Sequence, residues 1–164
     1  MSAYITLLTP MTDEECLLAA LADVGFDRTK VEVHASPAHL LGYQGDSRAQ
    51  IANIVIRRQH VGGSSNDVGF LATPTGYQAI VSEYDQSRFG AGWLTQIHGR
   101  YQAHAFAKQE QLAAEARRRM EAERQRLVEA QRKAVHEKAK KLGYQIKESR
   151  EGETIRLVLV KRTY

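Results

Sequence analysis

The chain has few of the features that define disulfide-bonded, membrane-spanning or secreted proteins. Its single cysteine, Cys16, excludes an internal disulfide and fits a reducing compartment. No apolar run approaches the ~18 to 20 residues of a membrane-spanning helix, so we expect no membrane partner. The segment Met1 to Pro10 lacks a basic flank and a cleavage site, and it predicts a first strand in place of a secretory leader. The expected location is therefore cytoplasmic.

Patterns typical of metal binding and catalysis are also missing. No cysteine pair and no His-x-x-x-His accompanies the six histidines, so we expect no metal site. The stretch Gly62-Gly63-Ser64-Ser65 lacks the lysine of a phosphate-binding loop and predicts a turn. Cys16 lies beside Glu14 and Glu15, which would raise the pKa of its thiol, so its expected role is packing. With no carboxylate pair placed for acid–base work, we predict a non-enzymatic protein with no cofactor.

What the chain does have is a long run of helix-forming residues from Ala107 to Leu142. The run contains no Gly, no Pro and almost no β-branched residue, so backbone preference alone favours helix. Its apolar residues are few: Leu112, Met120, Leu127, Val128, Val135 and Leu142. A helix that buries so little either extends into solvent or lies against a partner.

The positive charge of the chain is concentrated in this run. The formal net charge is +4, and Lys108 to Lys141 holds eleven Lys or Arg against six Glu, so the other residues sum to −1. This asymmetry suggests an acidic partner for the helix, either nucleic acid or an acidic protein face. The alternative is a solvated helix whose charges satisfy one another.

Strand and turn patterns precede the long run, around one short helix. Tyr4 to Leu8 predicts a strand, and Thr12-Asp13-Glu14-Glu15 predicts a capping box, with Thr12 as the cap of a helix that Gly25 ends. The β-prone runs that follow are 31–34, 39–43, 51–57, 68–72 and 77–84. Their short connections predict an antiparallel meander with one face covered.

A second helix is expected to begin near Trp93, with Leu94, Ile97 and Tyr101 on one face. If it continues unbroken to Leu142, it spans roughly 75 Å at ~1.5 Å per residue. That length exceeds the dimensions of the remaining chain, so the helix either protrudes or folds back as a helical hairpin. Because no Gly, Pro or Asn marks a turn in the run, we expect protrusion.

The end of the chain predicts a closing hairpin, with strands at Tyr144 to Lys147 and Ile155 to Val160. The helix end Val24-Gly25-Phe26 resembles Leu142-Gly143-Tyr144, and strands follow both. This similarity suggests two ferredoxin-like βαββ halves that share one sheet.

We therefore predict an α+β fold: an antiparallel sheet of about six to eight strands with two helices, the second very long and protruding. The whole chain, 1–164, is expected to form one domain. Within it, residues 107–141 are expected to form a protruding charged helical extension.

Seven basic side chains of the run could contact phosphates: Arg117, Arg118, Arg119, Arg124, Arg126, Arg132 and Lys133. Binding through them would depend strongly on salt. However, the interspersed glutamates weaken the field, and no aromatic residue lies among the arginines to stack on bases. Nucleic-acid binding is therefore the second hypothesis.

A protein partner is the first hypothesis, and it depends on spacing. Ala113, Met120, Leu127 and Ala134 recur every seven residues, as in a coiled-coil seam, but two of the matching second positions hold glutamate. That seam is too weak for an isolated coiled coil. It can serve a helix that docks into a partner's groove, with Met120 and Leu127 as anchors.

Several short motifs occur in the order of a known family. They are Met1 to Thr9, Val24-Gly25-Phe26, Gly42-Tyr43-Gln44-Gly45, Ala52 to Ile56, Asn66 to Phe70, Arg100-Tyr101, Lys141 to Tyr144 and Thr154 to Val158. In these motifs the chain resembles the hypothetical chloroplast reading frame 35 family, a domain of unknown function. It departs from the family by an insertion of roughly thirty residues, about Gln109 to Glu137, which is the arginine-rich stretch.

The resemblance implies no enzyme activity, cofactor or catalytic residue. Members are often encoded beside ATPases of the AAA type, which implies an accessory or adaptor role. Within the globular part we expect Tyr43, Arg100 and Tyr101 to form a functional surface. In the alternative, Tyr101 belongs to the core and Arg100 pairs with Asp67 or Asp85.

The resulting prediction is a non-enzymatic adaptor that binds a protein partner, with an AAA-type ATPase complex as a candidate, through its globular face and long charged helix. The alternative is a nucleic-acid-associated protein that uses the Arg-rich helix. Removing Ala107 to His136 should leave the domain folded and abolish the contact. The predicted partner-binding residues are Tyr43, Arg100, Tyr101, Arg117, Arg118, Arg119, Met120, Arg124 and Leu127.

Overall fold

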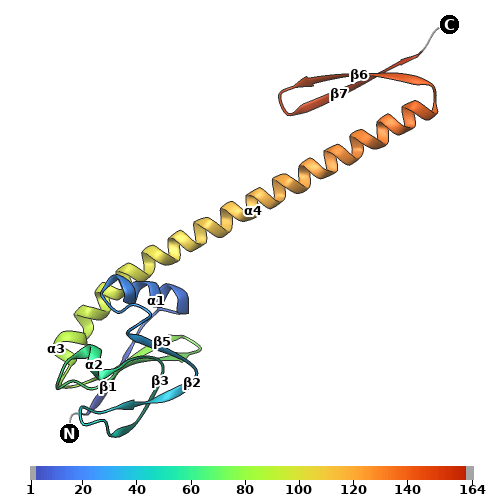
Figure 1. The fold of residues 1–164 in the computed structure, drawn as a ribbon. Coiled ribbons are helices and arrows are strands. Elements are labelled where there is room, and N and C mark those ends of the chain that lie inside the picture. The colour runs from blue at the N-terminus through green and yellow to red at the C-terminus, as the bar shows by residue number, and fades with distance from the viewer. Residues whose placement is uncertain (1–2, 162–164) are drawn as a thin grey trace. The chain divides into compact units, whose positions relative to one another are not determined.

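The computed structural model describes residues 3–161, which form seven strands and four helices (Figure 1). These residues belong to two units, Met1–Glu110 and Gln111–Tyr164, and the division falls inside the longest helix. Each unit has a sheet of its own.

Five antiparallel strands form the sheet of the first unit. They are β1 (Tyr4–Leu8), β2 (Val31–Leu41), β3 (Ser47–Ile56), β4 (Val68–Thr73) and β5 (Gly76–Ser82). Their order is β1-β5-β4-β3-β2, so the last four strands make a meander and β1 joins it beside β5. Short turns favour this order, because antiparallel neighbours need only a tight connection. The predicted antiparallel meander is confirmed.

Two long helices and two single-turn helices accompany the strands: α1 (Glu14–Asp23), α2 (Arg58–Val61), α3 (Gln86–Phe89) and α4 (Ala91–Lys141). The cap of α1 is Asp13, whose Oδ1 accepts the N–H of Cys16 at 2.9 Å. The predicted cap, Thr12, is therefore wrong by one residue. A carboxylate is the stronger acceptor here, because its charge also complements the positive end of the helix.

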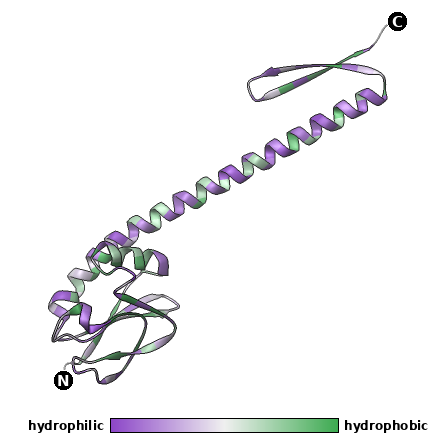
Figure 2. Ribbon diagram, viewed as in Figure 1, coloured by the Kyte–Doolittle hydropathy of each residue, from purple (hydrophilic) through white to green (hydrophobic). Residues whose placement is uncertain are grey.

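The main core of the first unit lies between one face of its sheet and two helices. Leu17 and Leu21 of α1 and Ile97 of α4 pack with Ile54 and Phe70 of the sheet. Figure 2 shows how rich α1 and the strands are in hydrophobic residues, whereas α4 becomes mostly hydrophilic along its length. The first turns of α4 therefore belong to the core of this unit.

A smaller cluster forms from strand residues that alternate with those of the main core. Val55 and Ile80 pack there with Leu40, and all three are buried. Gly69 leaves room for this packing, since a Cβ at position 69 would lie 2.6 Å from the Cβ of Ala52 and 3.0 Å from Leu40 Cδ2. Both faces of the sheet therefore carry buried residues, as expected for strands with few charged positions.

The second unit consists of residues 111–141 of α4 and the hairpin of β6 (Tyr144–Glu151) and β7 (Thr154–Lys161). The two strands pair from Tyr144 opposite Lys161 to Glu151 opposite Thr154. Gly143 ends α4 with φ 76°, and Gly152 turns the hairpin with φ 60°, a region that side chains disfavour.

The α+β class and the long second helix are confirmed, and α4 is continuous, so the helical-hairpin alternative is excluded. The shared sheet is a correction, because β6 and β7 pair as a separate two-stranded sheet. The similarity that suggested two ferredoxin-like halves has a local cause: Gly25 and Gly143 both end helices with positive φ.

Candidate functional site

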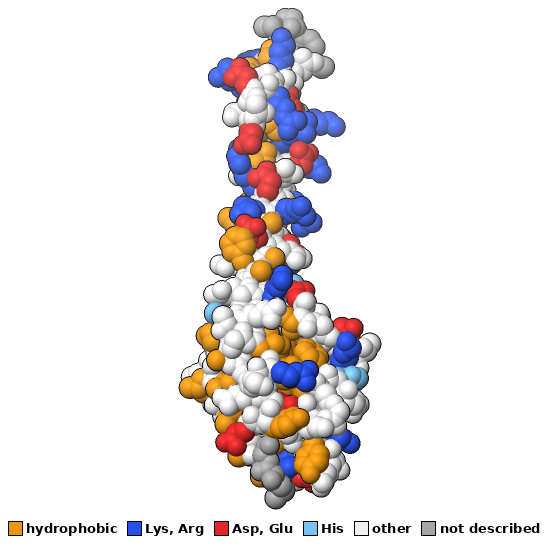
Figure 3. Space-filling model, turned by 90° about the vertical axis from the view of Figure 1, so that its left-hand side faces the viewer, with side chains coloured by type: hydrophobic (Ala, Val, Ile, Leu, Met, Phe, Trp, Pro, Cys, Tyr) orange, Lys and Arg blue, Asp and Glu red, His pale blue; other side chains and the backbone are white. Residues whose placement is uncertain are grey.

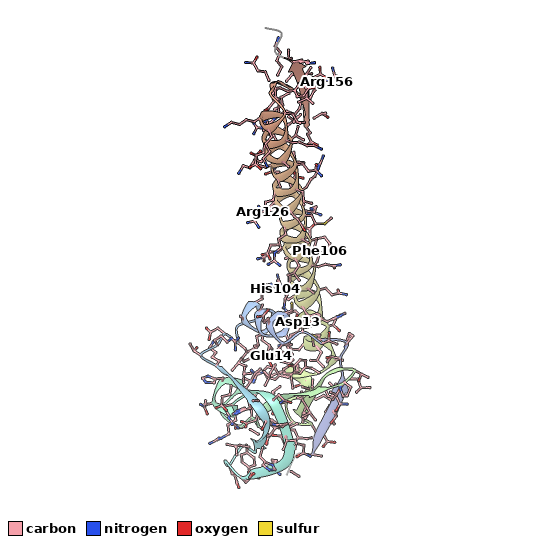
Figure 4. All side chains as sticks on the ribbon, turned by 90° about the vertical axis from the view of Figure 1, so that its right-hand side faces the viewer. Asp13, Glu14, His104, Phe106, Arg126 and Arg156 are labelled. Atoms are coloured by element: carbon pink, nitrogen blue, oxygen red, sulfur yellow. The ribbon has the colours of Figure 1, made fainter. Side chains whose placement is uncertain are left out.

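The first turns of α4 are attached to α1 through three residues of one helix face. The N–H groups of Thr12 and Asp13 donate to the Tyr101 hydroxyl at 3.1 and 3.0 Å. His104 Nε2 lies 2.8 Å from an Asp23 carboxylate oxygen, and Figure 4 labels the His104 side chain. Spacings of three and four residues place such side chains on one face.

Lys108 completes this contact by donating to both Asp13 and Glu15 at 2.7 Å. Its ammonium group is the main reason that the pKa of Asp13 falls from 3.8 to about 2. The same two hydrogen bonds raise the pKa of Lys108 above its ordinary value. The whole set holds the helix start in place, which is a structural task.

Cys16 lies inside α1 and is buried, with a relative exposure of 4%. Burial, and then the nearby Asp13 carboxylate, raises the pKa of its thiol above the ordinary value. A buried thiol with a raised pKa is a poor nucleophile. This environment agrees with the packing role expected from the sequence.

The predicted surface of Tyr43, Arg100 and Tyr101 is not assembled in the structure. Tyr101 is buried, with 8% exposure, and its hydroxyl accepts a hydrogen bond at the entry to α1. This is the alternative in which Tyr101 belongs to the core. Tyr43 is 44% exposed, and its backbone N–H donates to Asn66 Oδ1. Arg100 is exposed on α4, and no hydrogen bond or ion pair within residues 3–161 joins it to Tyr43.

Asp67 is the most connected buried polar residue of the first unit. Its carboxylate accepts from Arg57 Nη1 at 2.8 Å and from the N–H groups of Leu41 and Arg58 at 2.8 and 2.7 Å. The guanidinium that pairs with Asp67 thus belongs to Arg57, which corrects the expectation of Arg100. The contact joins the ends of β2, β3 and β4.

Asp85 lies beside this contact in a second buried group. Its Oδ2 accepts from Ser82 Oγ at 2.6 Å and from the N–H of Asn66 at 3.1 Å. Arg100 therefore pairs with neither aspartate in the part of the chain that the structure describes. Because every polar atom named here is satisfied by the protein itself, the group stabilises loops and offers no reactive centre.

The arginines of α4 differ in whether they have acidic partners. Arg124 pairs with Glu121 and Glu153, and Arg132 pairs with Glu129 and Glu148. Arg117, Arg118 and Arg119, which we call the arginine collar, are exposed and pair with no acidic side chain among residues 3–161. Figure 3 shows the mixed basic and acidic side chains along this helix.

The predicted anchors Met120 and Leu127 are 72% and 59% exposed. They lie in the same unit as a groove of about 470 Å³ between α4 and the hairpin, which Arg124, Val128, Arg150 and Ile155 help to line. α4 therefore exposes both arginines without acidic partners and apolar side chains. The sequence predicted these residues but not the groove, because nothing in it indicated that the hairpin packs against α4.

Two properties of the described residues concern metal binding and membrane crossing. Within residues 3–161, no three His, Cys, Asp or Glu side chains are grouped to hold a metal ion. Over the same residues, no helix combines the length and apolar character that crossing a membrane requires.

Comparison with known proteins adds no name to these surfaces: no family model, no curated protein and no solved structure matches the chain.

Proposed function

We propose that this chain is a non-enzymatic adaptor and that the arginine collar contacts an acidic face of a protein partner. The observation that carries the proposal is the free charge of Arg117, Arg118 and Arg119, set against the paired Arg124 and Arg132. Three adjacent guanidinium groups without internal partners keep their full attraction for carboxylates. The exposed Tyr43 and Arg100 of the first unit are available to the same partner.

The resemblance to the reading frame 35 family makes an AAA-type ATPase complex the first candidate partner. That candidate comes from analogy with the genes that neighbour members of that family. The chemistry of the collar specifies only an acidic protein surface.

A protein partner suits the geometry of the collar better than a nucleic acid does. Consecutive helix residues point about 100° apart, so Arg117, Arg118 and Arg119 form a short ring. A phosphate backbone needs basic residues repeated along one face, and the stripe closest to that is Arg126, Lys133 and Lys140, in line with Arg119 of the collar. Acidic neighbours interrupt this stripe. No aromatic residue lies between Arg117 and Lys141 to stack on bases.

The two basic sets provide a matched experiment. The variant Arg117→Glu/Arg118→Glu/Arg119→Glu and the variant Arg126→Glu/Lys133→Glu/Lys140→Glu change the net charge equally. Both would be compared with the wild-type full-length chain by affinity capture from the native lysate, with and without nuclease.

The adaptor proposal expects a nuclease-resistant protein partner that only the collar variant loses. Loss of every partner after nuclease treatment would replace it with the nucleic-acid hypothesis. In that case binding should fall steeply with salt, and the stripe variant should weaken it most. Equal loss in both variants would overturn the assignment of the collar.

A further inference from the structure

The second unit exposes many apolar side chains and fully buries few. Ala139 is its only buried hydrophobic side chain among the described residues. Exposed in the same unit are Leu112, Met120, Leu127, Val128, Val135, Leu142, Tyr144, Val158 and Leu159. A hairpin packed on one helix is marginal without further burial, since two strands alone are barely stable in water. Something must cover this surface.

The two edges of the hairpin differ in chemistry. β6 carries Lys147, Glu148, Arg150 and Glu151, the charged residues that protect a strand edge from pairing. The run Ile155 to Val160 of β7 has one charge, and β7 pairs with β6 alone in the described chain. β7 is therefore the edge that can accept another strand.

The apolar part of α4 lies on the same side as this edge. Val128 points towards the hairpin, since it lines the groove with Ile155. At about 100° per residue, Met120, Leu127 and Ala134 lie roughly 100° from Val128, all to the same side. We call these three residues the apolar flank.

Ion pairs show which strand of the hairpin the apolar flank borders. Arg124, turned about 40° from Val128 towards the apolar flank, contacts Glu153, the turn residue that leads into β7. Arg132 is turned by about the same angle the other way and contacts Glu148 of β6. The apolar flank thus borders β7, and Leu159, 53% exposed, lies between them on the helix-facing side of the strand.

We propose that a second copy of this chain covers the surface, by pairing its β7 antiparallel with β7 to form a four-stranded sheet. A twofold axis between antiparallel strands is perpendicular to the sheet, so both copies present the same face. Both α4 helices therefore lie on one side of the sheet, antiparallel to each other, and the apolar flanks approach each other at Leu127 and Ala134.

The spacing of the elements fits this arrangement. Each helix sits over two strands, and strands are about 4.8 Å apart, so the two helix axes are about 10 Å apart. Packed helices lie 8 to 10 Å apart, about the same separation.

Charge complementarity selects the register. With the axis at Leu157, Ile155 faces Leu159 of the second copy on the helix side, and Glu153 faces Lys161 of the second copy. An axis one residue earlier would place Arg156 opposite itself, which repulsion disfavours. The same surface on both copies is self-complementary, which is what identifies the occupant as a second copy.

The first test compares two exposed leucines of α4. Leu127 and Leu112 are 59% and 58% exposed, but only Leu127 belongs to the apolar flank. Sedimentation equilibrium of the full-length chain should show a dimer at micromolar concentration. Leu127→Glu should raise its dissociation constant on the order of tenfold or more, while Leu112→Glu should leave it within about twofold. A monomeric wild-type chain, or equal effects of the two variants, would overturn the proposal.

The second test addresses the register and does not depend on core packing. Glu153→Lys alone and Lys161→Glu alone each place like charges opposite each other and should weaken the dimer. An equimolar mixture of the two variants restores opposite charges at both positions, so it should dimerise several-fold more tightly than either variant alone. A mixture no tighter than its components would contradict the pairing at Leu157. Arg117, Arg118 and Arg119 are unchanged in all four variants, so a loss of dimerisation can be distinguished from a loss of the collar contact proposed above.

Discussion

The hydroxyl of Tyr101 accepts hydrogen bonds from two backbone N–H groups, those of Thr12 and Asp13, at the entry to α1. Removing it leaves both donors without that acceptor next to a buried ring. Tyr101→Phe should therefore lower the free energy of unfolding by about 1 to 3 kcal/mol. Urea unfolding followed by the fluorescence of Trp93, the single tryptophan, would measure it. Tyr84→Phe, at a residue 60% exposed, is the control and should change little.

The carboxylate of Asp13 connects stability to acid pH. Its pKa is about 2 in the folded chain against an ordinary 3.8, because Lys108 and the N–H of Cys16 favour the charged form. The stabilisation is complete above pH 3.8 and is lost as the pH falls towards 2. Asparagine keeps the cap but has no charge to lose.

The stability difference between the wild-type chain and Asp13→Asn should therefore shrink as the pH falls from about 4 to 2. Urea midpoints at a series of pH values would measure it, with Glu83→Gln as the control. A difference that stays constant over that range would show that the Lys108 contact does not contribute in solution.

Asp67 is fully buried and holds three strand ends through Arg57 and two backbone N–H groups. Asp67→Asn should destabilise the first unit by about 1 to 3 kcal/mol, because an amide offers one acceptor atom to the three donors, while Arg57 keeps its contact with Glu32 at 2.6 Å. The Trp93 unfolding midpoint would report the loss. A decrease near zero would mean that the remaining contacts of Arg57 and of the two N–H groups compensate for the lost charge.

At the scale of elements, α4 is one helix with two environments. Leu94, Ile97 and Tyr101 are buried in the core of the first unit, whereas beyond Glu110 only Ala139 among the described residues is a buried side chain. Helix propensity continues the element through both environments. Tertiary packing therefore stabilises only its first turns directly, and the rest depends on the hairpin and on what covers it.

A chain that ends at Glu110 should keep the fold of the first unit, because it retains the whole main core and the Lys108 contact. Its Trp93 unfolding midpoint should match that of the full chain. A chain that ends at Gly99 loses Tyr101 and should be much less stable. If ending at Glu110 also unfolded the first unit, residues beyond Glu110 would have to contribute to its stability.

At the scale of the whole molecule, two units with separate sheets should not unfold as one. Trp93 reports only the first unit, while circular dichroism at 222 nm is weighted by the long helix. The two urea transitions should therefore not coincide. Raising the protein concentration should shift the dichroism transition upward and leave the Trp93 transition in place, because a dimer is stabilised by mass action. Coincident transitions would mean that the units unfold together.

What the sequence alone determined was mostly local. The uninterrupted helix formers of α4, the glycines that end α1 and α4, and the alternating strands all act through backbone preference within a few residues, so they could be read directly. The candidate arginines and the anchors Met120 and Leu127 were visible for the same reason, since charge and apolar spacing are properties of the sequence.

Only the tertiary structure decided which residues meet. Tyr101 accepts the N–H groups at the entry to α1, Arg57 is the partner of Asp67, and β6 and β7 form a sheet of their own. Each outcome depends on which of several partners of similar chemistry the fold brings together. Packing and burial determine which partners meet, and a single sequence does not specify the result.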